Sequence, residues 1–148
     1  MRQRINDAVK AAMKSGDKAR LATLRLVTAA IKDRDLAQAA GADPVGDAEI
    51  VTVLQKMLKQ RRESIDVYRK NGREELAAQE EAEIAVIDEY LPKQMDDAET
   101  RQAVAGTIAD TGAAGLKDMG KVMAALKEKY AGTMDFGKAS ALVKELLK

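Results

Sequence analysis

The sequence contains no cysteine, no histidine and no tryptophan, and aromatic residues make up 3% of its 148 residues. Without cysteine the chain can form no disulfide, thiolate nucleophile, zinc–thiolate site or iron–sulfur cluster. Without histidine it lacks the commonest general base and metal ligand of proteins. These absences exclude most familiar catalytic constellations. From the residue types we therefore expect no catalytic residue, no metal site and no cofactor.

Long apolar runs are absent as well. The charged start, residues 1–7, is not followed by the apolar run of a signal peptide, and no stretch approaches the roughly 20 apolar residues of a membrane-spanning helix. Apolar residues make up 46% of the chain and charged residues 33%, which is typical of a globular protein. We expect a cytoplasmic protein without a membrane partner.

Helical periodicity dominates what is present. Apolar residues recur at three- and four-residue spacing nearly throughout, whereas the alternation typical of strands is hardly found. Seven apolar stripes predict seven helices, and the stripes begin at Ile5, Leu21, Ile50, Leu76, Val104, Met119 and Leu142. The methionines on these stripes, Met57, Met119 and Met123, are predicted to lie in the core.

Turn and capping residues separate the stripes. Ser15-Gly16-Asp17, Pro44 with Gly46, and Asn71-Gly72 predict the first three breaks. Asp47, Asp135, and Asp96 with Glu99 are predicted to cap the third, last and fifth helices. The pattern shifts near Pro92, so we expect an all-α fold with two subdomains: a four-helix bundle-like subdomain (residues 1–93) and a small three-helix subdomain (residues 94–148).

The net charge of +1 conceals charged blocks of both signs. Residues 1–34 hold nine basic and three acidic residues, and residues 56–73 hold seven basic and two acidic ones. Residues 74–89 hold seven acidic residues and no basic one. Because a tight turn joins the basic third helix to the acidic fourth, we predict ion pairs between these two helices.

Basic residues outside that pair have no acidic run next to them in sequence, so they form either a contact surface for an anionic partner or an ordinary solvated face. The candidate RNA-binding residues are Lys121, Lys127, Lys129, Lys138 and Lys144 near the C-terminus and Arg20, Arg25 and Lys32 near the N-terminus. Only Tyr130 and Phe136 lie among them, so stacking on single-stranded bases is disfavoured. We expect phosphate contacts to a folded RNA instead.

Three patterns in the sequence resemble functional sites but lack residues that those sites need. Residues 115–121 match the GxxxxGK pattern of a phosphate-binding loop, but Val122 stands where serine or threonine must bind magnesium. The acidic residues Glu80, Glu81 and Glu83 lack the histidines of a helical-bundle metal site and predict a solvated face. Ser64 lies inside a predicted helix without a histidine base, so we do not expect it to be a nucleophile.

Short motifs spread along the whole chain identify a family. These motifs are Thr23-Leu24-Arg25-Leu26 with Ile31-Lys32, residues 56–62 leading into Glu63-Ser64-Ile65, Gly72-Arg73 with Leu76-Ala77, Glu80 with Glu83-Ile84, Tyr90-Leu91-Pro92, Asp118-Met119-Gly120-Lys121-Val122-Met123, and Gly132 followed by Val143-Lys144. By these motifs the sequence resembles the YqeY-like proteins, which share the helical tail domain of GatB, a component of the glutamine-dependent aspartyl/glutamyl-tRNA amidotransferase.

The resemblance implies an all-α fold of GatB/YqeY type and a link to tRNA, because the GatB tail contacts tRNA. The family-level activity is that of a carbon–nitrogen ligase with glutamine as amido donor, but the proteins that perform it have no counterpart in this chain and supply no catalytic residue to it. We expect no enzyme activity from the chain alone. Three functions stay open: a tRNA-binding module, a protein-interaction module that docks on an amidotransferase or an aminoacyl-tRNA synthetase, and an accessory component of an amide-forming enzyme. The sequence does not give the oligomeric state.

Overall fold

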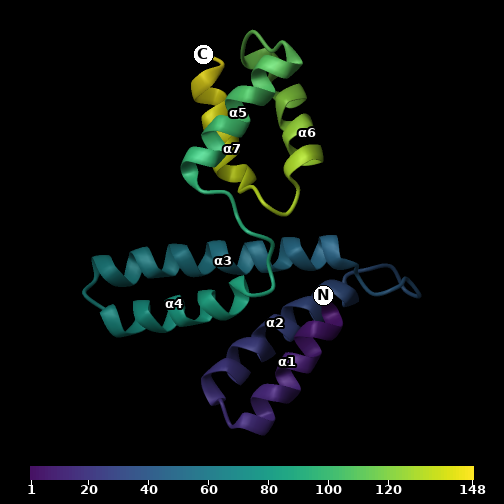
Figure 1. Cartoon of the computed structure of the whole chain (residues 1–148), viewed down its shortest axis with the longest axis vertical. Coiled ribbons are helices and arrows are strands. Elements are labelled where there is room, and N and C mark those ends of the chain that lie inside the picture. The colour runs from purple at the N-terminus through teal and green to yellow at the C-terminus, as the bar shows by residue number, and fades with distance from the viewer. The chain divides into compact units, whose positions relative to one another are not determined.

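The computed structural model describes residues 1–148 and is helical, with no strand, which confirms the all-α prediction (Figure 1). Its packing forms two compact units, Met1–Leu91 and Pro92–Lys148. The division into a bundle subdomain (residues 1–93) and a three-helix subdomain (residues 94–148) stays a prediction. The helices are α1 (Arg2–Ser15), α2 (Lys18–Leu36), α3 (Asp47–Lys70), α4 (Glu74–Asp88), α5 (Asp97–Thr111), a short 3₁₀ helix η1 (Leu116–Asp118), α6 (Met119–Tyr130) and α7 (Phe136–Leu146).

Capping residues set the helix ends that the sequence predicts for α5 and α7. The Asp96 carboxylate accepts a hydrogen bond from the backbone N–H of Glu99 at 2.7 Å, and the Glu99 side chain returns to the N–H of Asp96. The Asp135 carboxylate accepts from the N–H of Gly137 at 2.9 Å. Both predictions are confirmed, because these carboxylates satisfy N–H groups that have no partner within the helix.

The predicted cap of α3 is wrong. Gly46, in an extended conformation, is the N-cap residue, and Asp47 is the first residue of the helix. Asp47 therefore contributes only its negative charge to the first turn, where it interacts favourably with the helix dipole. The 3₁₀ helix η1 was not predicted either, because a single turn of three residues carries no apolar periodicity.

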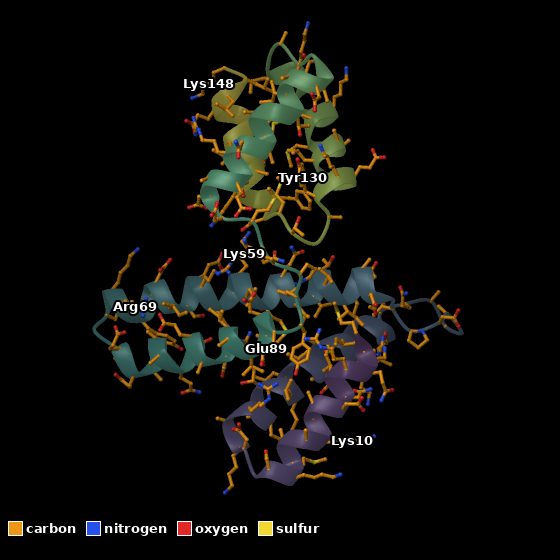
Figure 2. The ribbon with its side chains drawn as sticks, in the orientation of Figure 1. Lys10, Lys59, Arg69, Glu89, Tyr130 and Lys148 are labelled. Carbon is orange, nitrogen blue, oxygen red and sulfur yellow. The ribbon has the colours of Figure 1, made fainter.

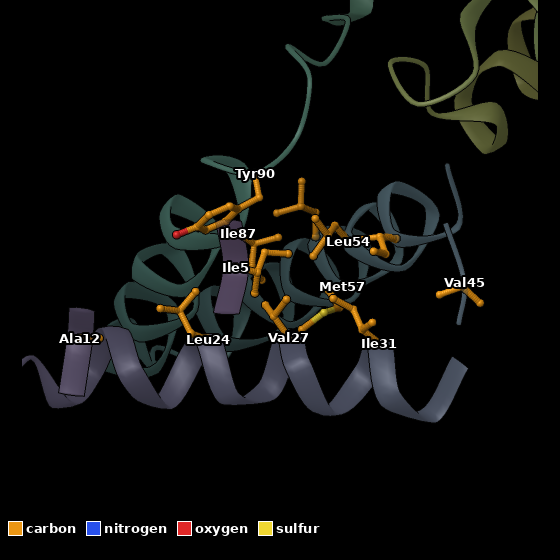
Figure 3. Packing of buried hydrophobic residues seen from close by; sticks show 12 residues of the cluster. Ile5, Ala12, Leu24, Val27, Ile31, Val45, Leu54, Met57, Ile87 and Tyr90 are labelled. Atoms are coloured by element: carbon orange, nitrogen blue, oxygen red, sulfur yellow. The ribbon is translucent and has the colours of Figure 1, made fainter. Parts of the chain in front are cut away.

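The first unit consists of two antiparallel hairpins, α1–α2 and α3–α4, which run obliquely to each other (Figure 1). Side chains from α2 point toward those of the other three helices, and Leu24, Val27, Leu54 and Ile87 are fully buried between them (Figure 3). Met57 belongs to this core, as predicted. Burying apolar side chains from all four helices is what holds the two hairpins together.

The second unit has its own core, built from Val104, Val122, Leu126, Met134, Ala139, Val143 and Leu147. Met119 and Met123 pack against it, which confirms the prediction for both. Helices α5 and α7 run in the same direction (Figure 1), and ion pairs join Asp97 to Lys138 and Arg101 to Glu145. The N–H of Met95, in the segment before α5, donates to the Thr133 carbonyl at 2.8 Å and so joins this segment to the turn between α6 and α7.

Candidate functional site

The basic helix α3 and the acidic helix α4 are paired through arginine. Arg61 Nε donates to a Glu83 carboxylate oxygen at 2.9 Å and lies 3.8 Å from Glu80, and the three side chains are largely buried. Arg69 pairs with Glu81 and Glu74. The predicted ion pairing between α3 and α4 is therefore confirmed. Burial, and next the charge of Glu83, raises the pKa of Glu80.

The pairing does not extend to all basic residues of α3. Lys56, Lys59, Arg62 and Lys70 are exposed and make no ion pair. They share the outer surface of the helix with Glu63 and Asp66, which are also exposed. Acidic residues on the same helix and on α4 reduce the attraction that this surface exerts on an anion.

Arg20, one of the candidate RNA-binding residues, is occupied inside the first unit. Its guanidinium donates to the Glu89 carboxylate and, at 3.0 Å, to the Tyr90 hydroxyl. Arg4 adds a hydrogen bond to the Glu89 carbonyl at 2.7 Å and stacks over the Tyr90 ring at 4.9 Å. Glu89 lies where the end of α4 meets the α1–α2 hairpin (Figure 2). Hydrogen bonding to Glu89 raises the pKa of Arg20, so this charge stabilises the fold and is poorly available to a phosphate.

Arg25 and Lys32 are exposed on α2 and have no carboxylate partner. Arg25 Nη2 contacts the Met13 sulfur at 3.9 Å. Lys18 lies seven residues before Arg25, and Lys32 seven residues after it, so the three lie on one side of the helix. Lys18 was not among the candidates, although this seven-residue spacing was visible in the sequence.

The candidate lysines of the second unit are dispersed. Lys138 pairs with Asp97 at 3.1 Å, and Lys129 lies over the Tyr130 ring at 5.5 Å. Lys121, Lys127 and Lys144 are exposed without a carboxylate partner, on different sides of α6 and on α7. Nine basic and eight acidic residues lie between residues 92 and 148, so this unit is nearly neutral.

The residues of the apparent phosphate-binding loop are mostly helical in the structure. Residues 116–118 form η1, and Gly120 and Lys121 lie in the first turn of α6. The Asp118 carboxylate accepts a hydrogen bond from the Ala114 N–H at 2.9 Å, which lowers the pKa of Asp118 and closes the turn. The backbone therefore has no open cradle for a phosphate at this position.

The acidic residues and Ser64 are the other side chains that the sequence singled out for possible chemistry. No group of three or more acidic residues is arranged to hold a metal ion. The Ser64 hydroxyl donates to the Gln60 carbonyl at 3.1 Å, within its own helix. A hollow of about 370 Å³ lies between α2 and α4, but its charged residues Arg20 and Glu83 are already paired with Glu89 and Arg61. None of the helices has the length and apolar composition needed to cross a membrane.

The fold and its surface define an all-helical protein of two small units, in which some exposed basic residues are paired with carboxylates and others are not. The chain belongs to the YqeY-like protein family, whose model matches residues 2–147. The resemblance drawn from the sequence motifs is confirmed.

Among its relatives, the chain is similar to the protein named "Altered inheritance of mitochondria protein 41, mitochondrial" of Eremothecium gossypii, with 32% identity over 83 residues, which are 56% of this chain and 44% of the relative. The protein of the same name from Lachancea thermotolerans is 34% identical over 83 residues, 56% of this chain and 43% of the relative. The matches thus span less than half the length of these relatives.

The predicted cytoplasmic location is contradicted by these relatives, whose names describe mitochondrial proteins. The prediction depended on the absence of an apolar signal sequence. That absence is evidence only about secretion, and it does not distinguish between compartments that proteins reach by other routes.

Proposed function

We propose that this YqeY-family protein binds a folded RNA, with tRNA as the first substrate to test, through contacts to phosphates. The supporting observation is the contrast between paired and unpaired basic residues. Arg61 and Arg69 are held by glutamates of α4, whereas Arg25, Lys32, Lys121, Lys127 and Lys144 are exposed without a carboxylate. A cation without an internal partner can neutralise a phosphate without breaking an existing ion pair.

The expected mode of recognition follows from the side chains beside these residues. Tyr130, next to Lys129, is half-buried and packs on the core of the second unit, so it offers little surface to a nucleobase. Phosphate and shape contacts to a structured RNA need no exposed aromatic residue. The resemblance to the GatB tail makes tRNA the natural first probe. We assign no glutamine-dependent ligase chemistry to the chain, because it contains no residue set that could perform it.

An electrophoretic shift assay with total tRNA at about 50 mM and about 200 mM salt tests this function. We expect a shift at the lower concentration that weakens steeply at the higher one, because phosphate binding releases counterions. A double-stranded DNA of equal charge is the control for non-specific attraction. Absence of a shift at low salt would rule out the proposal.

Docking on a protein partner, an amidotransferase or an aminoacyl-tRNA synthetase, is a second candidate function. Of the large apolar side chains that are strongly exposed, three lie on the α1–α2 hairpin: Met13 (52%), Leu26 (48%) and Leu36 (73%). Exposed leucines gain free energy from burial against a protein and little from phosphates. In this case nuclease-treated, purified amidotransferase should comigrate with the protein in gel filtration, and Leu26→Ser with Leu36→Ser should abolish comigration.

A further inference from the structure

A row of exposed basic residues without ion pairs lies on the α1–α2 hairpin. On α2, Lys18, Arg25 and Lys32 follow one another at seven-residue steps, which places each about 10.5 Å from the next along the helix axis, on the same side. The contact between Arg25 and Met13 identifies this side of α2 as the one that borders α1. The three residues therefore form a line of positive charge about 21 Å long beside the neighbouring helix.

Helix α1 extends this line of charge into a surface. Lys10 precedes Met13 by three residues, so it lies on the same side of α1 as the side chain that contacts Arg25. Figure 2 shows Lys10 on this hairpin, well apart from Arg69 on the α3–α4 hairpin. We call Lys10, Lys18, Arg25 and Lys32 the hairpin basic face. All four are exposed, and none is in an ion pair.

Most acidic residues of the hairpin are engaged elsewhere. Asp35 accepts two hydrogen bonds from Arg2, each of 2.9 Å, and a third from the Val45 N–H. Asp17 caps α2 by accepting from the Arg20 N–H, and Asp7 accepts from Gln3. Asp7, Asp17 and Asp33 keep their negative charge near the hairpin basic face, but residues 1–34 hold nine basic residues against these three acidic ones, whereas the second unit is nearly neutral. The positive electrostatic potential of the hairpin basic face extends into the solvent, where it attracts anions.

We infer that the hairpin basic face makes the principal phosphate contact to RNA, and that Lys10 and Lys18 belong to the binding site together with Arg25 and Lys32. The inference rests on the proposed function, because it takes the anionic partner to be RNA. It reassigns the main contact from the lysines of α6 and α7 to the first unit. Four phosphate contacts would contribute about three units to the slope of log affinity against log salt.

Three variants with the same loss of four positive charges test the site, with total tRNA as the probe. The hairpin variant carries Lys10→Gln, Lys18→Gln, Arg25→Gln and Lys32→Gln. The α3 control carries Lys56→Gln, Lys59→Gln, Arg62→Gln and Lys70→Gln, and the second-unit control carries Lys121→Gln, Lys127→Gln, Lys129→Gln and Lys144→Gln. Circular dichroism and thermal melting verify the fold of each. If the four-site hairpin variant does not fold, the double variant Lys18→Gln with Lys32→Gln replaces it. The expected decrease in the slope of log affinity against log salt is then half as large.

The hairpin variant should lose at least about tenfold in affinity at about 50 mM salt, and its salt slope should fall by about three units. The α3 control should lose less than about threefold. The second-unit control removes secondary contacts, so it should lose affinity, but clearly less than the hairpin variant. This pattern supports the inference, because net charge changes equally in all three variants and only the position of the charge differs.

Other results overturn the inference in distinguishable ways. If the second-unit control loses affinity and the hairpin variant does not, the proposed function holds and the assigned site is wrong. If all three variants lose tRNA affinity equally, binding depends on net charge alone, and the protein has no localised phosphate-binding site. If poly-L-glutamate competes as well as tRNA at equal charge, the face selects acidic polypeptides, and RNA is not its partner. If the parent protein shifts no tRNA, the proposed function fails and the inference with it.

Discussion

Arg61 carries a positive charge that is largely buried, and two glutamates lie close enough to compensate it. Its side chain is 13% exposed, and two carboxylates lie within 4 Å of its Nε, at 2.9 Å and 3.8 Å. The nearer one, Glu83, makes the hydrogen bond, while Glu80 lies beside Glu83 and is repelled by it. One arginine therefore compensates one glutamate well and the second only in part.

Glu80 and Glu83 should respond differently to neutralisation. Because the pKa of Glu80 is raised in the folded state, its ionisation costs stability above that pKa and costs nothing below the ordinary glutamate pKa. Glu80→Gln should therefore leave stability at pH 7 unchanged or raise it by up to about 1 kcal/mol, and the gain should vanish below about pH 4. Glu83→Gln should cost about 1–2 kcal/mol, since it removes the shorter bond to Arg61. Urea unfolding at both pH values measures this, and equal losses in the two variants would contradict it.

Asp35 should have the opposite pH dependence. Hydrogen bonds from Arg2, and next from the Val45 N–H, lower the pKa of Asp35. A lowered pKa contributes stability that is present above the ordinary aspartate pKa of about 4 and is lost as the pH falls through the folded value. We expect Asp35→Asn to be less stable than the parent at neutral pH and equally stable at strongly acidic pH. Stability curves that stay parallel over the whole pH range would show that the Arg2 contact makes no difference.

At the scale of the helix, two glycines of α5 have opposite roles. Gly112 ends the helix in the left-handed region, with φ of 66°, where a side chain is strained. Gly106 lies inside the helix, and nothing lies within 4 Å of the position a Cβ would take. One glycine is required by the backbone, and the other merely adds conformational freedom to the unfolded chain.

These roles predict changes in stability of opposite sign. Gly106→Ala should raise the free energy of unfolding by about 0.5–1 kcal/mol, because alanine favours the helix and meets no neighbour. Gly112→Ala should lower it by about 1 kcal/mol or more, because alanine resists a positive φ. Thermal melts of the two variants under identical conditions make the comparison. If Gly106→Ala lowers the melting temperature, the methyl group must clash with a neighbour, and the space around residue 106 is smaller than the structure describes.

At the scale of the whole molecule, each compact unit has a buried core of its own. Leu54 and Leu126 are both 0% exposed, one in each core. Replacing either by alanine should cost about 2–5 kcal/mol, because the lost contacts leave a cavity. If the units unfold separately, Leu126→Ala should speed amide hydrogen exchange in α5 to α7 and leave α1 to α4 at parental rates. Leu54→Ala is the reciprocal control, and faster exchange in all seven helices with either variant would show a single cooperative unit.

Local patterns in the sequence predicted much of the fold. The apolar stripes predicted seven helices, and Asp96 and Asp135 predicted two of the caps, because periodicity and capping depend on residues a few positions apart. The signs of the charges on α3 and α4 predicted their pairing, because a tight turn makes two consecutive helices neighbours. Gly46 took the cap expected of Asp47, since a glycine without a side chain can also occupy the N-cap position.

Residue order and local periodicity therefore account for the fold class, most helix positions and the blocks of charge. Which charges are available to a partner depends on how the helices pack against one another. Arg20 is held by Glu89, 69 residues away, and Lys138 by Asp97, 41 residues away, whereas Lys18 and Lys10 are left unpaired. The physical reason is that an ion pair forms between side chains that packing brings within a few ångströms, and residue order does not specify which helix faces will meet.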